Sequence, residues 1–313
     1  MSRCLYCYTL LEVGQVDFHP ACSRKMFGSA TPPELPYSEK DISKLALEFI
    51  QERVSVTGVQ PKLSLAMTSG KEPKKFTIVG LWGNFILKPP SNGFPSLPEN
   101  EDLVMHLAAL CGISTVPHSL IRLKSGSLAY ITKRIDRSKS GKHHMEDMCQ
   151  LTERMTEHKY AGSHEQIAKA ILKYSANPLL DAINFYELTL FCYLTGNADM
   201  HLKNFSLMDK PGIGYHLSPA YDLLCTAVAN PADEEELALT LNGKKNKIKL
   251  NDFQKAMTGA HISTKVIDGI FAQYKKHHIP AMLKFIEICF LPKELKQQVK
   301  ELIQSRASTF FPV

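Results

Sequence analysis

The stretch Gly196-Asn-Ala-Asp-Met-His-Leu-Lys-Asn204 follows directly on a long apolar run, Pro178 to Thr195. Because that run is apolar on nearly every side, it predicts a buried helix, and the glycine after it predicts where the helix ends. Downstream, residues 205–208 and 215–217 favour two strands, and the turn residues between them favour a hairpin. The sequence therefore predicts a polar loop between a buried helix and a β-hairpin.

Two carboxylates and an amide in this region have the spacing that phosphoryl transfer requires. Asp199 and Asn204 form an Asp-x-x-x-x-Asn pair in the loop, and Asp222 follows the predicted hairpin. Transfer of the terminal phosphoryl group of ATP needs a carboxylate that positions the incoming hydroxyl and oxygen ligands that hold Mg²⁺, and protein kinases supply them in this order. The alternative is a polar loop that satisfies the end of the buried helix. The catalytic interpretation is favoured because the remaining parts of the set occur in order along the chain.

A lysine and a glutamate upstream belong to that set. Lys88 ends a predicted strand, residues 83–87, just before two prolines, and would reach the phosphates of ATP. Its expected ion-pair partner is Glu101, at the start of the next predicted helix, and Glu99 is the second choice. A surface lysine is the alternative interpretation of Lys88.

A turn with one glycine, Gly58, lies between two predicted strands in residues 55–66. One glycine does not by itself establish phosphate binding, although Lys62 could add positive charge there. A short helix is expected at residues 39–52 and further strands at residues 76–79 and 128–131. Other helices are expected from about residue 99 and at residues 267–274, 282–290 and 295–303.

Composition limits the class of protein. The chain has 313 residues, 44% hydrophobic and 22% charged, which fits a folded globular protein. No run approaches the roughly 18 apolar residues of a membrane helix, and no apolar leader is seen, so we expect a cytoplasmic protein. A net charge of +6 is weak evidence for nucleic acid, and the basic run at residues 244–249 is either a solvated turn or a phosphate-binding patch. The five cysteines from Cys111 onward are expected to be reduced core residues.

Four residues near the N-terminus have the spacing of a structural zinc site. Cys4-x-x-Cys7 and His19-x-x-Cys22 offer three thiolates and one imidazole, a set that suits a tetrahedral ion. The alternative is a small knuckle of reduced residues without metal. No further group suggests an open coordination position, so we expect the metal to have no catalytic role.

Six ordered strings within residues 50–225 resemble the HipA-like serine/threonine kinases of bacterial toxin–antitoxin systems. They are Ser55-Val-Thr-Gly-Val-Gln-Pro-Lys62, Pro98-Glu-Asn-Glu101, Lys133-Arg-Ile-Asp-Arg137, Glu146-Asp-Met-Cys-Gln150, Gly196-Asn-Ala-Asp-Met-His-Leu-Lys-Asn-Phe-Ser206 and Leu217-Ser-Pro-Ala-Tyr-Asp222. The resemblance implies an α+β, two-lobed, protein-kinase-like fold. We expect a zinc knuckle at residues 1–30, a mixed-sheet N-lobe at residues 31–137 and a mainly helical C-lobe at residues 138–313.

The resemblance also implies roles for individual residues. Asp199 would be the catalytic base, and Asn204 and Asp222 would ligate Mg²⁺. The residues that would bind the nucleotide are Thr57, Gly58, Val59, Gln60, Lys62, Lys88, Lys133, Ile135, His201, Lys203 and Tyr221, of which the first five would form a phosphate loop and Lys133 to Ile135 the hinge against adenine. Ser55 and Thr57 would be sites of autophosphorylation, which expels the loop and silences the enzyme.

Long members of this family carry an extra N-terminal domain, which this sequence lacks. It is therefore more similar to the short HipT-type toxins of tripartite HipBST-like systems, in which that domain is a separate small protein. The resemblance implies a protein substrate such as an aminoacyl-tRNA synthetase, growth arrest as the outcome, and two partners. These are a small HipS-like antitoxin and a HipB-like helix-turn-helix repressor, through which alone DNA would be contacted; no membrane partner is expected.

Two other functions remain as alternatives. A small-molecule phosphotransferase of the aminoglycoside or choline kinase kind uses the same Asp-x-x-x-x-Asn logic, but such enzymes usually have a histidine before the aspartate, where this chain has Ala198. A catalytically inactive co-repressor module has no need of Asp199, Asn204 and Asp222 in register. Both features favour the protein kinase.

Overall fold

A computed structural model of the chain describes residues 2–42, 44–45, 62–68, 74–79, 83–91, 93–138 and 141–311. The chain divides into two compact units. Unit 1 comprises Met1–Asp102 and Val116–Ile135, and unit 2 comprises Leu103–Thr115 and Asp136–Val313.

Unit 1 is built on a five-stranded antiparallel sheet with the strand order β2-β1-β3-β5-β4. Its strands are β1 (Leu63–Met67), β2 (Phe76–Val79), β3 (Phe85–Lys88), β4 (His118–Arg122) and β5 (Leu128–Lys133). The register of β3 and β5 sets Lys88 opposite Tyr130. Helix α3 (Leu97–Leu110) follows β3 in the chain, and its first residues, up to Asp102, belong to unit 1.

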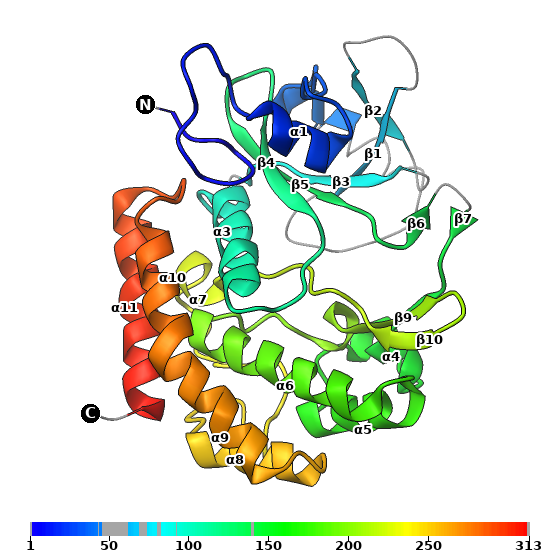
Figure 1. Cartoon of the computed structure of the whole chain (residues 1–313), viewed down its shortest axis with the longest axis vertical. Coiled ribbons are helices and arrows are strands. Elements are labelled where there is room, and N and C mark those ends of the chain that lie inside the picture. Colours follow the sequence, from blue (N-terminus) through cyan, green and yellow to red (C-terminus); the bar gives the residue numbers. More distant parts are fainter. Residues whose placement is uncertain are drawn as a thin grey trace. The chain divides into compact units, whose positions relative to one another are not determined.

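Helix α1 (Pro20–Phe27) lies against this sheet (Figure 1). Proline in its first turn and Gly28 with a φ of 74° mark its two ends. Phe27 packs edge-on against Phe76 of β2 at 5.9 Å between ring centroids, and Phe76 packs in the same way against Phe85 of β3 at 5.2 Å. Aromatic packing therefore fixes the N-terminal segment to the sheet.

Unit 2 is mainly helical. Its α-helices are α4 (Met148–Leu151), α5 (His164–Tyr174), α6 (Pro178–Thr195), α7 (Thr226–Ala229), α8 (Leu250–Gly259), α9 (Thr264–Gln273), α10 (Ile279–Ile286) and α11 (Lys293–Phe310). Two short 3₁₀-helices, η1 (Thr156–His158) and η2 (Leu202–Asn204), and a π-helix, η3 (Tyr274–His278), accompany them. Helix α6 contacts α5, α8, α11 and the strand β10, and α10 lies beside α11 (Figure 1). Most of α6 from Asp181 onward is buried.

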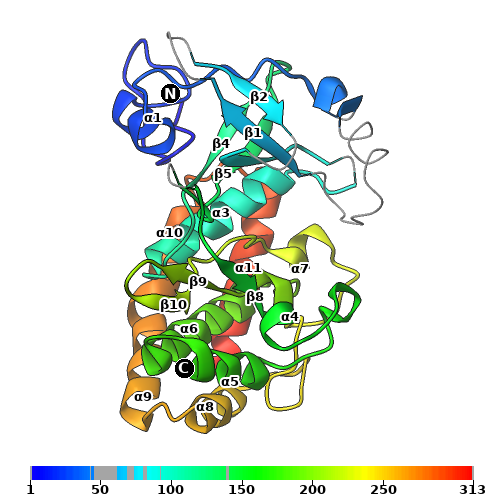
Figure 2. The same cartoon turned by 90° about the vertical axis from the view of Figure 1, so that its right-hand side faces the viewer.

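A three-stranded sheet, ordered β10-β9-β8, completes unit 2 (Figure 2). It consists of β8 (Met145–Asp147), β9 (Ser206–Lys210) and β10 (Gly214–Leu217), and a separate pair is formed by β6 (Arg137–Ser138) and β7 (Gly141–Lys142). The buried carboxylate of Asp181 on α6 accepts from the Leu217 amide at 2.9 Å and from the Ser175 hydroxyl at 2.5 Å. The bond from the Leu217 amide connects strand β10 of the β9–β10 hairpin to the buried helix α6.

Most of the local predictions agree with the described residues, although the helix expected at residues 282–290 is α10, which spans Ile279–Ile286. The buried helix is α6, Gly196 ends it with a φ of 73°, and β9 and β10 form the expected hairpin. Residues 39–42 and 44–45 are helical, while the rest of the helix expected at residues 39–52, and the turn around Gly58, lie outside the described residues. The elements that were not expected from the sequence are the helices α1, α4, α5, α7 and α8 and the strands β4, β6, β7 and β8.

Among the described residues, no helix combines the length and the apolar character needed to cross a membrane.

Candidate active site and metal site

The end of α6 fixes the start of the Asp199 loop, residues 197–204. Gly196 adopts the left-handed conformation that glycine tolerates, and a Cβ there would lie 2.4 Å from Leu302 Cδ2. Thr226, at the start of α7, forms hydrogen bonds with the first residues of the loop and with Gly196 before it. Its hydroxyl accepts from the Ala198 amide at 2.8 Å and donates to the Gly196 carbonyl at 3.0 Å.

Asp199 is half-buried, whereas its neighbours Ala198 and Met200 are buried. Its amide donates to Asn197 Oδ1 at 3.1 Å, and its carbonyl accepts from Asn204 Nδ2 at 3.0 Å. The second bond orients the Asn204 amide, so that Oδ1 of Asn204 is the atom suited to bind a cation. The loop therefore holds one accessible carboxylate and one oriented amide in fixed positions.

Tyr160, just after η1, contacts the Asp199 carboxylate. Its hydroxyl donates to Asp199 Oδ1 at 2.6 Å, and its ring meets that of His201 edge-on at 5.0 Å. Burial, and then this hydrogen bond to Asp199, raises the pKa of Tyr160, which keeps the hydroxyl a donor. Sequence reasoning missed Tyr160, because nothing in its local sequence marks it.

Asp222 and His201 share the surroundings of Asp199. Burial lowers the pKa of His201, while the charges of Asp199 and Asp222 both act to raise it. Asp222 adopts a φ of 62°, a strained conformation for a residue with a side chain. Aspartate tolerates this conformation better than most residues with a side chain, and it occurs in turns as well as at functional sites.

Lys203 and Tyr221 connect the Asp199 loop to β8 and β9. Lys203 Nζ lies 2.7 Å from Asp147 Oδ2, and Asp147 also caps α4 in a capping box with Gln150. The Tyr221 hydroxyl lies 2.6 Å from Ser206 Oγ and donates to the Lys203 carbonyl at 3.1 Å. Asp147 lies in one of the strings quoted above, but no role had been assigned to it.

In unit 1, Lys88 pairs with Glu101. Lys88 Nζ lies 2.5 Å from Glu101 Oε1, and the two side chains are only 6% and 2% exposed. The ammonium group also lies 5.4 Å from the centroid of the Tyr130 ring, within the range of a cation–π contact. Glu99, the second choice, is half-buried, and burial raises its pKa.

The remaining predicted nucleotide contacts are placed as follows. Lys62 is exposed just before β1. The Lys133 amide donates to Pro117 O at 2.9 Å and its ammonium group to Lys25 O at 3.1 Å. Ile135 is half-buried just after β5. Ser55, Thr57, Gly58, Val59 and Gln60 lie outside the described residues.

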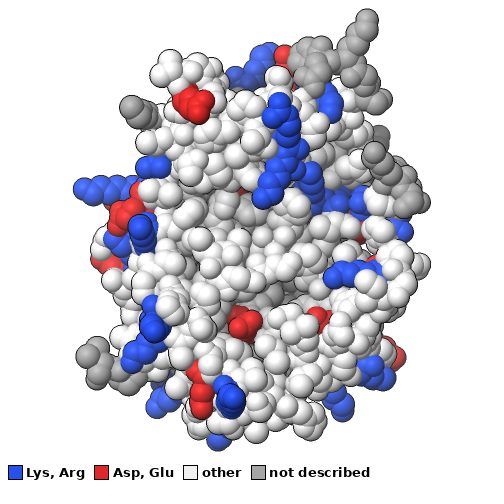
Figure 3. All heavy atoms as spheres, viewed as in Figure 1, with Lys and Arg blue, Asp and Glu red and all other residues white. Residues whose placement is uncertain are grey.

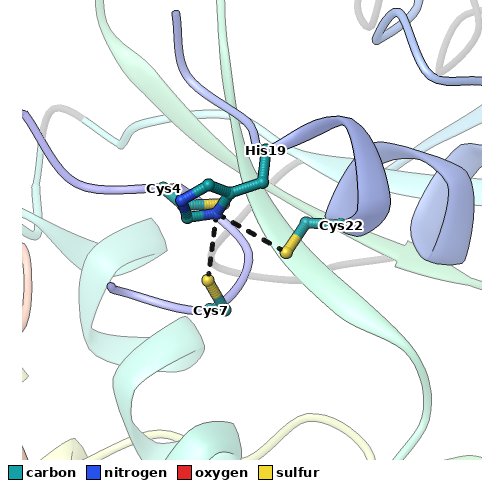
Figure 4. Close-up of side chains that lie close together, drawn as sticks. All are labelled: Cys4, Cys7, His19 and Cys22. Atoms are coloured by element: carbon teal, nitrogen blue, oxygen red, sulfur yellow. Dashed lines mark hydrogen bonds between the residues drawn. The ribbon is translucent and has the colours of Figure 1, made fainter. Parts of the chain in front are cut away.

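Cys4, Cys7, His19 and Cys22 form a cluster in which all four possible ligand atoms lie within 4.8 Å of one another (Figure 4). His19 Nδ1 lies 3.5 Å from Cys7 Sγ and 3.8 Å from Cys22 Sγ, while Nε2 lies 3.0 Å from the Leu10 carbonyl. A proton on Nε2 satisfies that carbonyl and leaves the Nδ1 lone pair toward the thiols, as in metal-ligating histidines. The donor set and its geometry therefore fit a tetrahedral ion.

Two of the four lysines in the basic run at residues 244–249 form ion pairs with nearby carboxylates. Lys244 lies 2.9 Å from Asp252, and Lys245 lies 3.0 Å from Glu235. Figure 3 shows Lys and Arg side chains interspersed with Asp and Glu and with broad uncharged areas over the helices of unit 2. These pairings favour a solvated turn over a phosphate-binding patch.

Comparison with known proteins defines the class first. A chain of the complex of Shewanella oneidensis HipA and HipB with operator DNA superimposes with a TM-score of 0.68, covering 85% of this chain and 70% of that one at 23% identity. The Helicobacter pylori proinflammatory kinase CtkA gives a TM-score of 0.50, covering 79% of this chain and 93% of that one at 15% identity. The fold is therefore the α+β kinase-like fold.

The family follows from the sequence. The chain belongs to the family of the HipA-like C-terminal domain, whose model it matches over residues 54–301. It is 32% identical over 249 residues to Y4dM of Sinorhizobium fredii, which is described as a kinase, covering 75% of this chain and 57% of that protein. It is 27% identical over 224 residues to the serine/threonine-protein kinase toxin HipA of S. oneidensis, covering 65% of this chain and 50% of that protein. The chain spans about half the length of these curated relatives.

The buried Lys88–Glu101 pair predicts a specific pattern of stability. Lys88→Met leaves the Glu101 carboxylate buried without its ammonium partner and should lower the free energy of unfolding by about 3–5 kcal/mol. The double variant Lys88→Met/Glu101→Gln should be less destabilised than Lys88→Met alone, because it removes the buried charge. Urea denaturation followed by tryptophan fluorescence and circular dichroism measures both.

Lys75→Met is the matched control for this experiment. Lys75 pairs with Glu34 at 3.1 Å, with the side chains 55% and 52% exposed, so its loss should cost less than about 1 kcal/mol. Equal destabilisation by Lys75→Met and Lys88→Met would contradict the burial argument.

Proposed function

We propose that this chain is an ATP- and Mg²⁺-dependent serine/threonine protein kinase that acts as the toxin of a toxin–antitoxin system. The observation that supports it most is the Asp199 loop. The loop presents one accessible carboxylate, that of Asp199, and one amide oriented by the backbone, that of Asn204. The charges of Asp199 and of a second carboxylate, Asp222, both act to raise the pKa of His201. Family membership and the kinase-like fold support the same conclusion.

Each residue then has a defined task. Asp199 orients the substrate hydroxyl and accepts its proton, displacing the hydroxyl of Tyr160 that now occupies Oδ1. Oδ1 of Asn204 and the Asp222 carboxylate are hard oxygen donors that fit Mg²⁺, which when bound neutralises phosphate charge. Lys88, held by Glu101, contacts phosphate, and His201, kept neutral at pH 7 by burial, adds no competing positive charge.

The finer assignments belong to the same proposal. The protein substrate belongs to a class such as the aminoacyl-tRNA synthetases, and self-control comes from autophosphorylation at Ser55 or Thr57. A phosphate there adds about two negative charges beside those of ATP, and the repulsion opens the loop. The chain is of the short HipT type.

Asp199→Asn and Asp222→Asn should each lower phosphoryl transfer at least about 100-fold while leaving the unfolding midpoint nearly unchanged, because these groups act on the reacting atoms. Mass spectrometry of the chain incubated with ATP and Mg²⁺ measures the rate and also shows whether phosphate reaches the peptide with Ser55 and Thr57. Asp268→Asn, on the exposed side of α9, is the control and should label as fast as the wild type. Wild-type labelling by Asp199→Asn would overturn the assignment of the base.

We further propose that a HipS-like antitoxin and a HipB-like repressor bind this chain. The S. oneidensis relative was solved in complex with HipB and operator DNA, which supports a partner of the second kind. Co-expression of the chain with the products of its two neighbouring genes should give a complex on size-exclusion chromatography and reduced toxicity. Elution of the chain alone, with unchanged toxicity, would rule the partners out.

The Cys4, Cys7, His19 and Cys22 cluster is proposed to bind one structural Zn²⁺. Burial acts to raise the pKa of Cys7, but hydrogen bonds from Thr9, Cys22 and Cys4 together outweigh it and lower that pKa to about 7, which favours the thiolate form that binds metal. Burial, and then the neighbouring Cys7, raise the pKa of Cys22 to about 12, so in the absence of metal the thiolate lies on Cys7 rather than Cys22. Residues 4–8 form a tight turn, which is closed by a hydrogen bond from the Tyr8 amide to the Cys4 carbonyl at 2.9 Å. The metal would close this turn onto α1.

Metal analysis should find one zinc per chain in protein purified without chelator. Cys7→Ser should weaken zinc binding and lower the unfolding midpoint, because binding free energy is also folding free energy. Cys289→Ala, which removes a buried thiol outside the cluster, should keep the full zinc content. A wild-type chain without stoichiometric metal would contradict the proposal.

A further inference from the structure

The Cys4, Cys7, His19 and Cys22 cluster is linked to the Lys88–Glu101 pair through one side chain, that of Tyr8. Tyr8 lies next to the candidate ligand Cys7 and has a φ of 61°. The side chain is 0% exposed. Its hydroxyl donates to Asp102 Oδ2 on α3 at 2.7 Å.

Asp102 is held on both of its oxygens. Oδ1 lies 2.7 Å from His118 Nδ1 on β4, and the carboxylate side chain is 0% exposed. A buried carboxylate is stable only when it accepts hydrogen bonds of this kind, so Tyr8 and His118 together determine where the second turn of α3 lies. Glu101 precedes Asp102 directly in that turn and moves with it.

The contacts continue from His118 back to Lys88. The His118 ring stacks on Tyr130 at 5.9 Å with an interplanar angle of 23°, and Lys88 Nζ lies 5.4 Å from the centroid of the same Tyr130 ring. The Lys88 ammonium group thus has Glu101 on one side and Tyr130 on the other. Both neighbours are connected to Asp102. Glu101 precedes Asp102 in α3, and Tyr130 stacks on His118, which contacts the Asp102 carboxylate.

The metal-binding segment is itself anchored on β4. The Leu5 carbonyl accepts from the Leu120 amide at 3.3 Å and from the Ser119 hydroxyl at 3.0 Å. Arg122 pairs with Asp17 at 2.8 Å. These contacts hold the segment as a whole in place on β4. A metal ion at the four ligands would therefore control only the conformation of residues 4–8.

We infer that Tyr8 is a positioning residue for the Lys88–Glu101 pair, and that metal at Cys4, Cys7, His19 and Cys22 promotes ATP binding through it. The inference rests on the proposed kinase function. The metal does not touch the nucleotide. It holds the turn of residues 4–8, the turn aims the Tyr8 hydroxyl at Asp102, and Asp102 keeps Glu101 in place to present Lys88.

The test is a thermodynamic cycle on ATP affinity, measured by calorimetry with the full chain in excess Mg²⁺. Tyr8→Phe keeps the buried ring and removes only the hydrogen bond to a charged group, so ATP affinity should fall about tenfold. Tyr6→Phe removes a hydroxyl two residues away and should bind ATP like the wild type. Unfolding midpoints of both variants report whether the fold is retained.

Combining Tyr8→Phe with a second change, either Lys88→Met or removal of zinc, distinguishes a positioning role of Tyr8 from a general loss of stability. In the Lys88→Met background, Tyr8→Phe should cause no further loss of ATP affinity, because the group it positions is gone. Removing zinc from the wild type with a zinc-selective chelator should lower ATP affinity as much as Tyr8→Phe does, should have no further effect on Tyr8→Phe, and should be reversed by added Zn²⁺.

The outcomes distinguish the inference from the function on which it rests. Unchanged ATP affinity in Tyr8→Phe, or an equal loss in the wild-type and Lys88→Met backgrounds, would overturn the inference alone. A wild-type chain that binds no ATP would overturn the proposed function and the inference with it.

Discussion

Burial of α6 is the constraint on which unit 2 depends. The helix contacts α5, α8, α11 and β10, so neither its axis nor its last turn can move without opening the core. Gly196 ends it in a conformation that suits glycine, and a side chain there would meet Leu302. The Asp199 loop therefore starts from one fixed point and needs only short polar contacts, from Thr226 and Asn204, to hold Asp199 in place.

In unit 1 the corresponding constraint is electrostatic. Asp102 and Glu101 place two adjacent carboxylates in a buried position, and such groups are tolerated only when donors or cations satisfy them. Lys88, His118 and Tyr8 supply these partners from β3, β4 and the N-terminal segment. Because each partner comes from a different element, the same contacts that stabilise the carboxylates also set the positions of the elements.

Much of this arrangement could be predicted from the sequence, because it depends on local patterns. The all-round apolar run and the glycine after it are enough to predict α6 and its end, and turn residues are enough to predict the β9–β10 hairpin. The spacing of Asp199 and Asn204 is likewise local. Strand β8 was missed because it pairs with β9, which lies far along the chain, so no short stretch reveals it. Strand β4, by contrast, forms a hairpin with β5 through the turn at residues 123–127, and its signal is local.

What the sequence determined by itself was therefore the set of groups: a loop with its carboxylate and amide, a lysine at a strand end with an acidic helix start, and four metal-binding side chains near the N-terminus. Only the tertiary structure decided which of these groups touch. In the folded chain Lys88 pairs with Glu101 and not with Glu99. Tyr160 contacts Asp199, 39 residues away in the sequence, and Tyr8 contacts Asp102, 94 residues away. The physical reason is that residue types and short spacings record chemistry and local backbone preference, whereas contacts between distant residues follow from how buried faces pack, which no single segment encodes.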